Sequence, residues 1–163
     1  PRNGAVPRFY ASGEHAHILA ELDDKGINVP VLDGPIGRAS GLKMVYAALT
    51  KGTSALYAST LMTAKSLGLY SDLISELKLS QTGTLAGMER VKTVSASAFR
   101  WIGEMDEIAA TFDQAGTSPS THTGAAETFQ MIADSSIGHE RVDSVDRSRS
   151  LEESIAAMLI RAD

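Results

Sequence analysis

Hydrophobic positions follow a helical period most clearly between Ala39 and Leu67, where no strong helix breaker interrupts the chain. Proline precedes this stretch at Pro35 and does not recur until Pro119. A run of this length, at 1.5 Å per residue, predicts a helix about 43 Å long. Apolar residues on one arc of it recur at a spacing of 3.6 residues, which predicts a face packed into a helical bundle. They are Leu42, Val45, Leu49, Leu56 and Leu67.

Lys43 lies about one turn inside the start of this helix, on a side that small or polar groups line. Ala47, Thr50 and Ser54 fall near its azimuth, so we expect this side to stay open for another body. The positive end of the helix disfavours the charged form of a lysine, which suits a general acid or base. Small residues over more than one face also permit close approach of a second helix, which predicts a homodimer: Ala47, Ala48, Gly52, Ala55, Ala58 and Ser59.

The chain before residue 34 has the pattern of a strand, a helix and a second strand. Residues 8–12 and 27–32 have strand character, and residues 14–25 have helical spacing that Gly26 ends. So short a unit cannot bury both faces of a parallel sheet. We therefore expect residues 1–33 to be the tail of a larger α/β domain, and the start at Pro1 without methionine indicates a fragment of a longer protein.

The chain after the long helix is predicted to be helical throughout, so that residues 34–163 form one all-helical domain and the fold is mainly α. Ser71 is expected to cap a helix that ends at Leu79, and Gly83 is expected to break the chain before the next. The capping box Ser150-x-x-Glu153 predicts the last helix, through about Arg161. The expected helices are residues 71–79, 84–93, 98–114, 125–133 and 150–161. Residues 135–148 are polar and non-periodic, which predicts a surface loop or mobile linker.

The composition mainly argues against certain partners, membrane spans and cysteine chemistry. The 163 residues are 43% hydrophobic and carry a net charge of −5, which argues against nucleic acid or an anionic membrane as the main partner. No apolar run is long enough to span a bilayer and no signal-peptide pattern opens the chain, so cytoplasm is the default expectation. Zero cysteines exclude disulfides and thiolate chemistry.

Other motifs favour structural interpretations. The motif Gly34-x-x-Gly37-x-x-x-Gly41 lies between a strand and a helix, but its spacing fits neither the dinucleotide-binding fingerprint nor the P-loop. This mismatch favours a turn followed by close helix packing. The four histidines offer no H-x-x-x-H pair, so no metal site is predicted. Glu104 is expected to pair with Arg100 on a solvated helix face. Trp101 is expected in the core or an interface.

The order of these elements resembles the β-hydroxyacid dehydrogenase superfamily, which includes 3-hydroxyisobutyrate dehydrogenase and 6-phosphogluconate dehydrogenase. A strand–helix–strand ending is followed by Gly37-x-x-x-x-x-Lys43, a long helix and a helical bundle. Three segments are similar to a subgroup of NAD(P)-dependent oxidoreductases related to 6-phosphogluconate dehydrogenase: residues 39–52, residues 8–13 and residues 100–105.

The resemblance implies a Rossmann domain upstream and a helical domain used for dimerisation and for closing the active site. Lys43 falls on the catalytic lysine of the superfamily, and Ser40, Tyr46 and Thr50 would lie near a small-molecule substrate. Many relatives have Asn-Asn or His-Asn where this chain has Tyr46-Ala47, so the substrate-orienting amide is missing. NAD or NADP would be bound mainly by the upstream domain. An imine reductase and a non-catalytic helical dimerisation module remain as alternatives.

Overall fold

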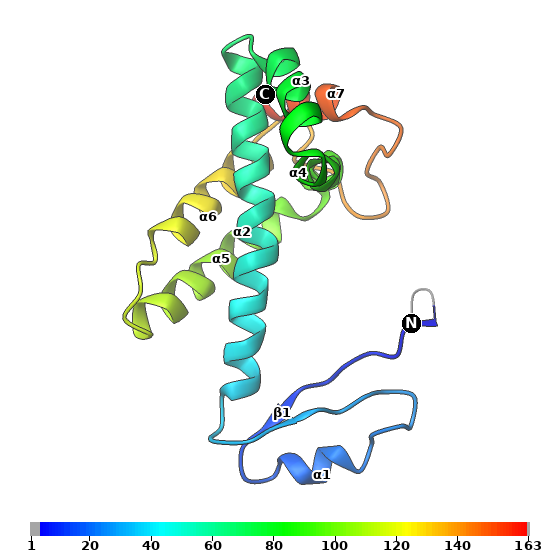
Figure 1. Cartoon of the computed structure of the whole chain (residues 1–163), viewed down its shortest axis with the longest axis vertical. Coiled ribbons are helices and arrows are strands. Elements are labelled where there is room, and N and C mark those ends of the chain that lie inside the picture. Colours follow the sequence, from blue (N-terminus) through cyan, green and yellow to red (C-terminus); the bar gives the residue numbers. More distant parts are fainter. Residues whose placement is uncertain (1–3, 163) are drawn as a thin grey trace. The chain divides into compact units, whose positions relative to one another are not determined.

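The computed structural model of the chain describes residues 4–162. The chain forms two compact units, Pro1–Tyr46 and Ala47–Asp163. Helix α2, Arg38–Ser66, begins in the first unit and continues into the second (Figure 1). Its bounds lie within one residue of the prediction. The predicted domain of residues 1–33 begins outside the described residues, and its assignment to a nucleotide-binding domain stays a prediction.

The first unit is a parallel strand–helix–strand unit, as the pattern predicts. Strands β1 (Ala11–Ser12) and β2 (Val31–Leu32) pair in register, Ala11 with Val31 and Ser12 with Leu32. Helix α1 between them, Ala16–Ala20, is shorter than the predicted 14–25. Turns that include Asp24 at a φ of 60° occupy the remainder of that stretch.

The start of α2 is tied to the end of β1 by a side chain. The hydroxyl oxygen of Ser12 accepts a hydrogen bond of 3.0 Å from the backbone N–H of Ala39. This N–H is one of the four that a helix leaves without a partner at its start. Gly13 next to it has a φ of +99°, and a Cβ there would lie 2.6 Å from the side chain of Ile36. Glycine is therefore required where β1 passes the turn before α2.

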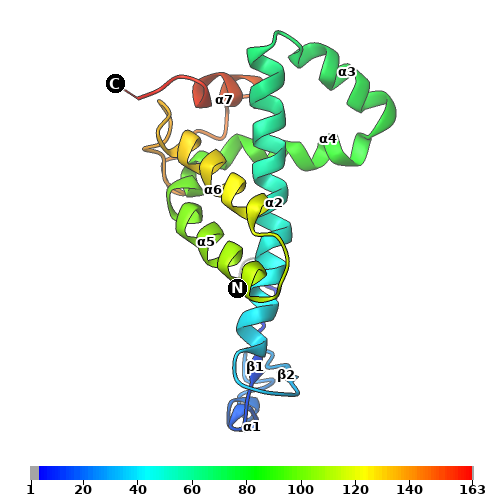
Figure 2. The same cartoon turned by 90° about the vertical axis from the view of Figure 1, so that its left-hand side faces the viewer.

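The second unit is all-helical in its named elements, and no strand lies in residues 45–115. Figures 1 and 2 show these helices beside α2, with α4 running across its direction and α5 and α6 oblique to it. They are α3 (Tyr70–Ser80), α4 (Thr82–Met88), η2 (Glu89–Thr93), α5 (Ser95–Gln114), α6 (Ser120–Ala133) and α7 (Leu151–Met158). Several predicted boundaries are wrong. Helix α3 begins before Ser71 and α4 contains Gly83. Helices α5 and α6 begin three and five residues earlier than predicted, and α7 ends three residues before Arg161. A glycine inside a helix costs only about 1 kcal/mol, which packing can offset.

The predicted apolar face of α2 is also wrong. Its five residues are exposed, from 42% to 69%: Leu42, Val45, Leu49, Leu56 and Leu67. The buried residues lie on roughly the opposite side of the helix and are mostly alanines: Ala47, Ala48, Ala55, Ala58, Leu61, Met62 and Ala64. Small side chains allow neighbouring helices to approach closely. A Cβ at Gly52 would lie 3.9 Å from the ring of His122, and one at Gly87 of α4 would lie 3.1 Å from the ring of Tyr57.

Large side chains from several helices form the core of the second unit. Met105 and Ile108 of α5 and Phe129 and Ile132 of α6 are fully buried. Trp101 packs edge-on against Phe129 with ring centroids 5.1 Å apart, which places it in a core contact. The expected ion pair of Glu104 with Arg100 is wrong. Glu104 pairs with Lys51 of α2, because the neighbouring helix brings that amine closer than the residue one turn away.

The C-terminal part confirms one prediction and corrects another. Ser150 and Glu153 form both halves of the predicted capping box at the start of α7. Residues 135–148 contain no helix or named strand, as expected, but the segment is anchored. Glu140 within it is only 6% exposed, accepts a 2.6 Å hydrogen bond from the hydroxyl of Ser95, and pairs with Arg149. In residues 4–162 no helix combines the length and apolar character that crossing a bilayer needs.

Candidate functional site

A hollow of about 600 Å³ lies beside Lys43, within the unit Pro1–Tyr46. Two stretches of the chain line it. Arg8, Phe9 and Tyr10 come from the segment that leads into β1. The first turns of α2 contribute Ala39, Ser40, Leu42, Lys43 and Tyr46. The structure therefore brings three of the predicted site residues, Ser40, Lys43 and Tyr46, into one hollow.

Local backbone pairing explains why these stretches meet. Arg8 pairs with Asn28 in a parallel bridge, and the N–H of Phe9 donates to the carbonyl of Asn28 at 2.8 Å. The Ser12–Ala39 hydrogen bond then holds the first turn of α2 at the end of β1. Ser40 and Tyr46 stand three residues before and after Lys43, so the three side chains follow one ridge of the helix.

Arg8 and Tyr10 are lining residues that sequence reasoning did not select. They lie in a segment, Arg8-Phe9-Tyr10-Ala11-Ser12-Gly13, that contributed to the family resemblance. The position of this segment just before a strand was the available signal, because strand ends next to helix starts are common places for sites. Which side chains would face Lys43 depended on the turn at residues 34–37, which periodicity does not predict.

The electrostatics of the hollow favour a negatively charged ligand. Arg8 and Lys43 contribute two cations, and none of the described residues that line the hollow has a carboxylate. Hydroxyl groups of Tyr10, Ser40 and Tyr46 add hydrogen-bonding capacity, and Phe9 and Leu42 add apolar walls. The side chain of Lys43 is exposed within its unit, so its amine is accessible to a ligand.

Thr50, the fourth predicted site residue, lines a different hollow. That hollow has a volume of about 270 Å³ and lies within the second unit, where Thr53 and Tyr57 of α2 and Arg90 of η2 also line it. The hydroxyl of Thr50 donates to the carbonyl of Ala47 at 3.3 Å. The structure thus separates Thr50 from the hollow that contains Lys43, and its role near a substrate stays a prediction.

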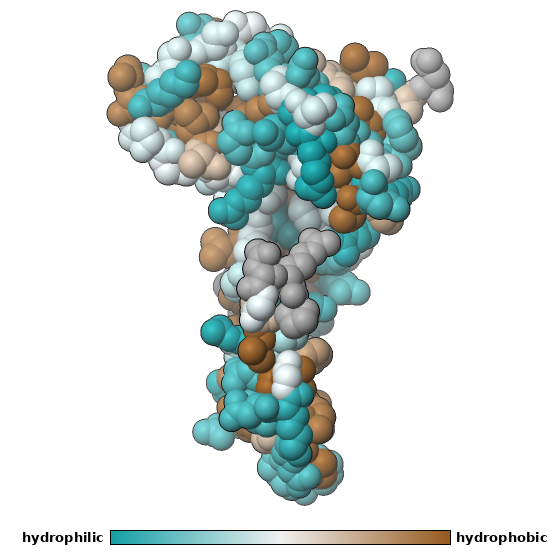
Figure 3. Space-filling view, turned by 90° about the vertical axis from the view of Figure 1, so that its right-hand side faces the viewer, coloured by the Kyte–Doolittle hydropathy of each residue, from teal (hydrophilic) through white to brown (hydrophobic). Residues whose placement is uncertain are grey.

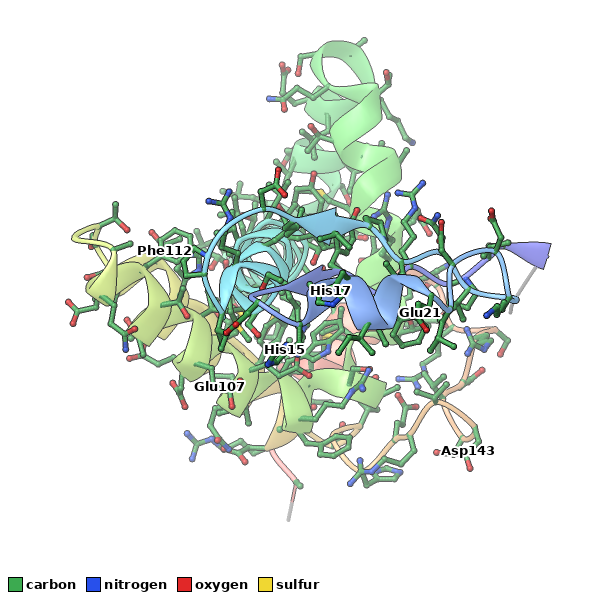
Figure 4. All side chains as sticks on the ribbon, turned by 90° about the horizontal axis from the view of Figure 1, so that it is seen from below. His15, His17, Glu21, Glu107, Phe112 and Asp143 are labelled. Carbon is green, nitrogen blue, oxygen red and sulfur yellow. The ribbon has the colours of Figure 1, made fainter. Side chains whose placement is uncertain are left out.

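Histidines and carboxylates do not gather into a metal centre within residues 4–162, where no group of three or more suitable ligands occurs. His15, His17 and Glu21 come from α1 and the residues that flank it, whereas Glu107 and Phe112 belong to α5 of the other unit (Figure 4). His17 Nδ1 lies 3.1 Å from the carbonyl oxygen of Glu14.

His122 of α6 is buried, at 6% exposure, with its ring 4.2 Å from that of Phe112 and its Nδ1 without a hydrogen-bond partner. Because burial disfavours the charged imidazolium, the pKa of His122 is lowered. The histidine is therefore a neutral core residue at neutral pH.

Comparisons with known proteins found one matching family and solved structures with a similar fold. Residues 64–132 match a family described as a domain of unknown function, DUF1932. The chain is 29% identical to conserved protein MTH1747 of unknown function, whose structure was described as similar to 3-hydroxyacid dehydrogenases. That match covers 82% of this chain and 52% of the other, with a TM-score of 0.65.

A conserved hypothetical protein from Sinorhizobium meliloti 1021 has the same fold, with a TM-score of 0.73 at 21% identity, over 93% of this chain and 51% of that one. The chain therefore spans about half the length of both solved structures. No curated protein matches the chain. The family resemblance is confirmed: residues 64–132 match the DUF1932 domain, which is found in the C-terminal part of 3-hydroxyacid dehydrogenase-like proteins, and the chain has a mainly α fold that resembles that part.

Proposed function

We propose that this chain is the C-terminal part of an NAD(P)-dependent dehydrogenase of the hydroxyacid type, with Lys43 as the acid/base group. The observation that carries the proposal is the hollow in which Lys43 meets Arg8, Ser40 and Tyr46. The similarity of MTH1747 to 3-hydroxyacid dehydrogenases supports the reaction class. In this proposal residues 34–163 are the substrate and dimerisation domain.

The described residues do not fit a dinucleotide by themselves. Their sheet has two strands of two residues each, and Gly34, Gly37 and Gly41 lack the spacing of the Rossmann fingerprint. NAD or NADP would supply the hydride acceptor. We propose that it is held mainly by residues outside this chain, so that this chain contributes the proton step and the substrate contacts.

The proton step follows from the chemistry of alcohol oxidation. A hydroxyl group that becomes a carbonyl loses its proton as the carbon loses a hydride. Neutral Lys43 Nζ would accept that proton, and in the reverse direction its ammonium group would return it. Ser40 and Tyr46 would orient the reacting hydroxyl through hydrogen bonds.

Arg8 offers a binding group in place of the amide that this chain lacks. Relatives carry an amide four residues after the lysine, but this position is Ala47, which is buried. A guanidinium binds a carboxylate through two parallel hydrogen bonds. We propose that Arg8 holds the acid group of the substrate in place of the missing amide.

Kinetics of the dehydrogenase that contains this chain test the division of roles. Arg8→Gln should raise KM for a hydroxyacid about tenfold or more, because it removes a charge-assisted contact. KM for a neutral alcohol of similar size should not change. Equal effects of Arg8→Gln on the acid and on the neutral alcohol would contradict the carboxylate contact.

We also propose a homodimer, on a different face from the one the sequence suggested. Ala47, Ala48, Ala55 and Ala58 are already buried inside the unit, so they cannot form the contact. Exposed leucines of α2, with Leu67 just after its end, offer an apolar surface instead: Leu49, Leu56 and Leu67 are between 63% and 69% exposed. Figure 3 shows hydrophobic side chains at the surface of the helical unit among hydrophilic ones. A second copy would cover this face in a two-fold symmetric contact.

Light scattering tests the dimer. At roughly tens of micromolar, the wild type should be a dimer and Leu56→Asp a monomer. Leu79→Asp is the matched control, because Leu79 is an exposed leucine of α3 outside this face, at 85% exposure. A monomeric wild type would contradict the proposal. If dimerisation holds while Lys43 has no role in catalysis, the non-catalytic dimerisation module becomes the better account.

A further inference from the structure

The smaller hollow, of about 270 Å³, has a lining that the proposed dehydrogenase reaction does not use. It lies within the second unit, between the middle of α2 and the pair α4 and η2. Hydroxyl groups of Thr53, Ser54 and Tyr57 line one side, and Gly87 and Arg90 line the other. Its volume lies just below the roughly 300–1,000 Å³ of pockets that hold drug-sized ligands. The hollow therefore suits one small group and is too small for a dinucleotide.

Arg90 is the sole charged residue among the described residues that line this hollow. Its guanidinium has no ion-pair or hydrogen-bond partner within residues 4–162. The neighbouring carboxylate, Glu89, is paired with Lys92 at 3.0 Å. A guanidinium without a carboxylate partner, in a protein of net charge −5, has its five donors available to an incoming anion.

The hydroxyl groups beside Arg90 add donors of the same kind. Ser54 donates to the carbonyl of Thr50 at 3.0 Å and is therefore occupied. The hydroxyls of Thr53 and Tyr57 have no hydrogen-bond partner within the described part of the chain. Three side chains thus present unpaired donors to the same space, and no described residue that lines it has a carboxylate.

Packing fixes the backbone that carries Arg90 and the ring of Tyr57, while the side chain of Arg90 itself is exposed. Met88 and Val91, on either side of the segment that carries Arg90, are 4% and 1% exposed. The ring of Tyr57 lies against the backbone of Gly87, where a Cβ would be 3.1 Å from the ring and 3.3 Å from the hydroxyl oxygen. A Cβ at Gly87 would require the phenol to shift by a few tenths of an ångström.

We propose that this hollow binds the anionic group of a small ligand, a carboxylate or a phosphate, through the guanidinium of Arg90 and the hydroxyls of Thr53 and Tyr57. Both groups present oxygen acceptors that match a planar guanidinium and two hydroxyl donors. The proposal does not depend on Lys43 or on the dehydrogenase reaction, because every residue it uses lies in the second unit.

Calorimetric titration of the 163-residue chain tests the proposal, with inorganic phosphate in one series and acetate in the other, at constant ionic strength. We expect saturable binding of at least one anion and a loss of affinity of about tenfold or more in Arg90→Gln. The anion that binds more tightly identifies the group. Lys78→Gln is the matched control, because it removes one positive charge from exposed Lys78 of α3, which does not line the hollow.

A second pair of variants guards against an effect of charge alone. Tyr57→Phe removes only the hydroxyl, and Gly87→Ala displaces the phenol, so each should weaken binding while the melting temperature of Tyr57→Phe stays near that of the wild type. The proposal is overturned if neither anion binds saturably, or if Lys78→Gln weakens binding as much as Arg90→Gln.

Discussion

The two compact units differ most in the size of the side chains that they bury. The core of the first unit consists of Ala11, Ala16 and Val29, with Ile27 packed against it. The second unit fully buries much larger side chains: Phe129, Leu61, Met105, Ile108, Ile132 and Ile155. Burial of one such large apolar side chain contributes roughly 1.5–3 kcal/mol. The second unit therefore has the driving force to fold by itself, and the first has little.

The candidate site belongs to the unit with the smaller core. Arg8, Ser40 and Lys43 are held by short strand pairing and by the Ser12–Ala39 hydrogen bond. Apolar residues of α1 and of the turn that follows it remain exposed there: Ile18, Leu19 and Leu22. A two-stranded sheet cannot cover both its faces, which accords with a unit completed by further strands. The helical unit therefore holds the larger core, whereas the proposed chemistry lies in the first unit.

The largest expected effect is on the core of the second unit. Phe129→Ala should lower its free energy of unfolding by about 3–5 kcal/mol, because it leaves a cavity among fully buried side chains. Urea denaturation followed by circular dichroism measures the change. Phe99→Ala is the control, since Phe99 is 43% exposed and should cost much less. Equal losses in the two variants would contradict the assignment of Phe129 to the core that stabilises the second unit.

A smaller effect is expected at the anchor of residues 135–148. Glu140→Gln removes the charge that pairs with Arg149 and weakens the bond from Ser95. The free energy of unfolding should fall by about 1.5–3 kcal/mol, the range for a hydrogen-bonded buried charge. Asp143→Asn in the same segment, at the exposed position labelled in Figure 4, should change it little. If Glu140→Gln is as stable as the wild type, the segment is a loose loop after all.

The smallest effect concerns pH and belongs to the second unit alone. The pKa of buried His122 is lowered from its usual 6.5, so the unfolded chain binds a proton more readily than the folded one. Stability should therefore fall as pH drops below about 6.5 and level off below the folded pKa. His122→Gln should flatten this slope in denaturation curves between about pH 5 and 7.5. His139→Gln, at an exposed position, should keep it.

Local signals in the sequence predicted the elements well. The run from Ala39 to Leu67 predicted α2 because nothing in it opposes a helix, and Ser150 with Glu153 predicted the start of α7. The predictions at Ser71 and Gly83 were wrong because the free energy of a helix cap or a helix-breaking glycine is only about 1 kcal/mol. Packing of the surrounding side chains contributes more.

The burial pattern of α2 was not predictable in the same way. Periodicity shows that Leu49 and Leu56 share a face, but it does not show whether this chain or another body covers that face. The alanines Ala55 and Ala58 are buried because they let helices approach closely. Arg8 was missed for a similar reason, since its place beside Lys43 arises from the pairing of Arg8 with Asn28 and from the turn at residues 34–37, which periodicity does not predict.

The proposed role of Lys43 is tested most directly by single-turnover hydride transfer in the proposed dehydrogenase. Lys43→Met keeps most of the side-chain length and removes the ionisable nitrogen. The rate should fall about 10²–10⁴-fold, with an unchanged melting temperature because Lys43 is exposed in its unit. Lys78→Met, outside the hollow, should keep the wild-type rate. A Lys43→Met variant with the wild-type rate and melting temperature would contradict the assignment of Lys43 as the acid/base group.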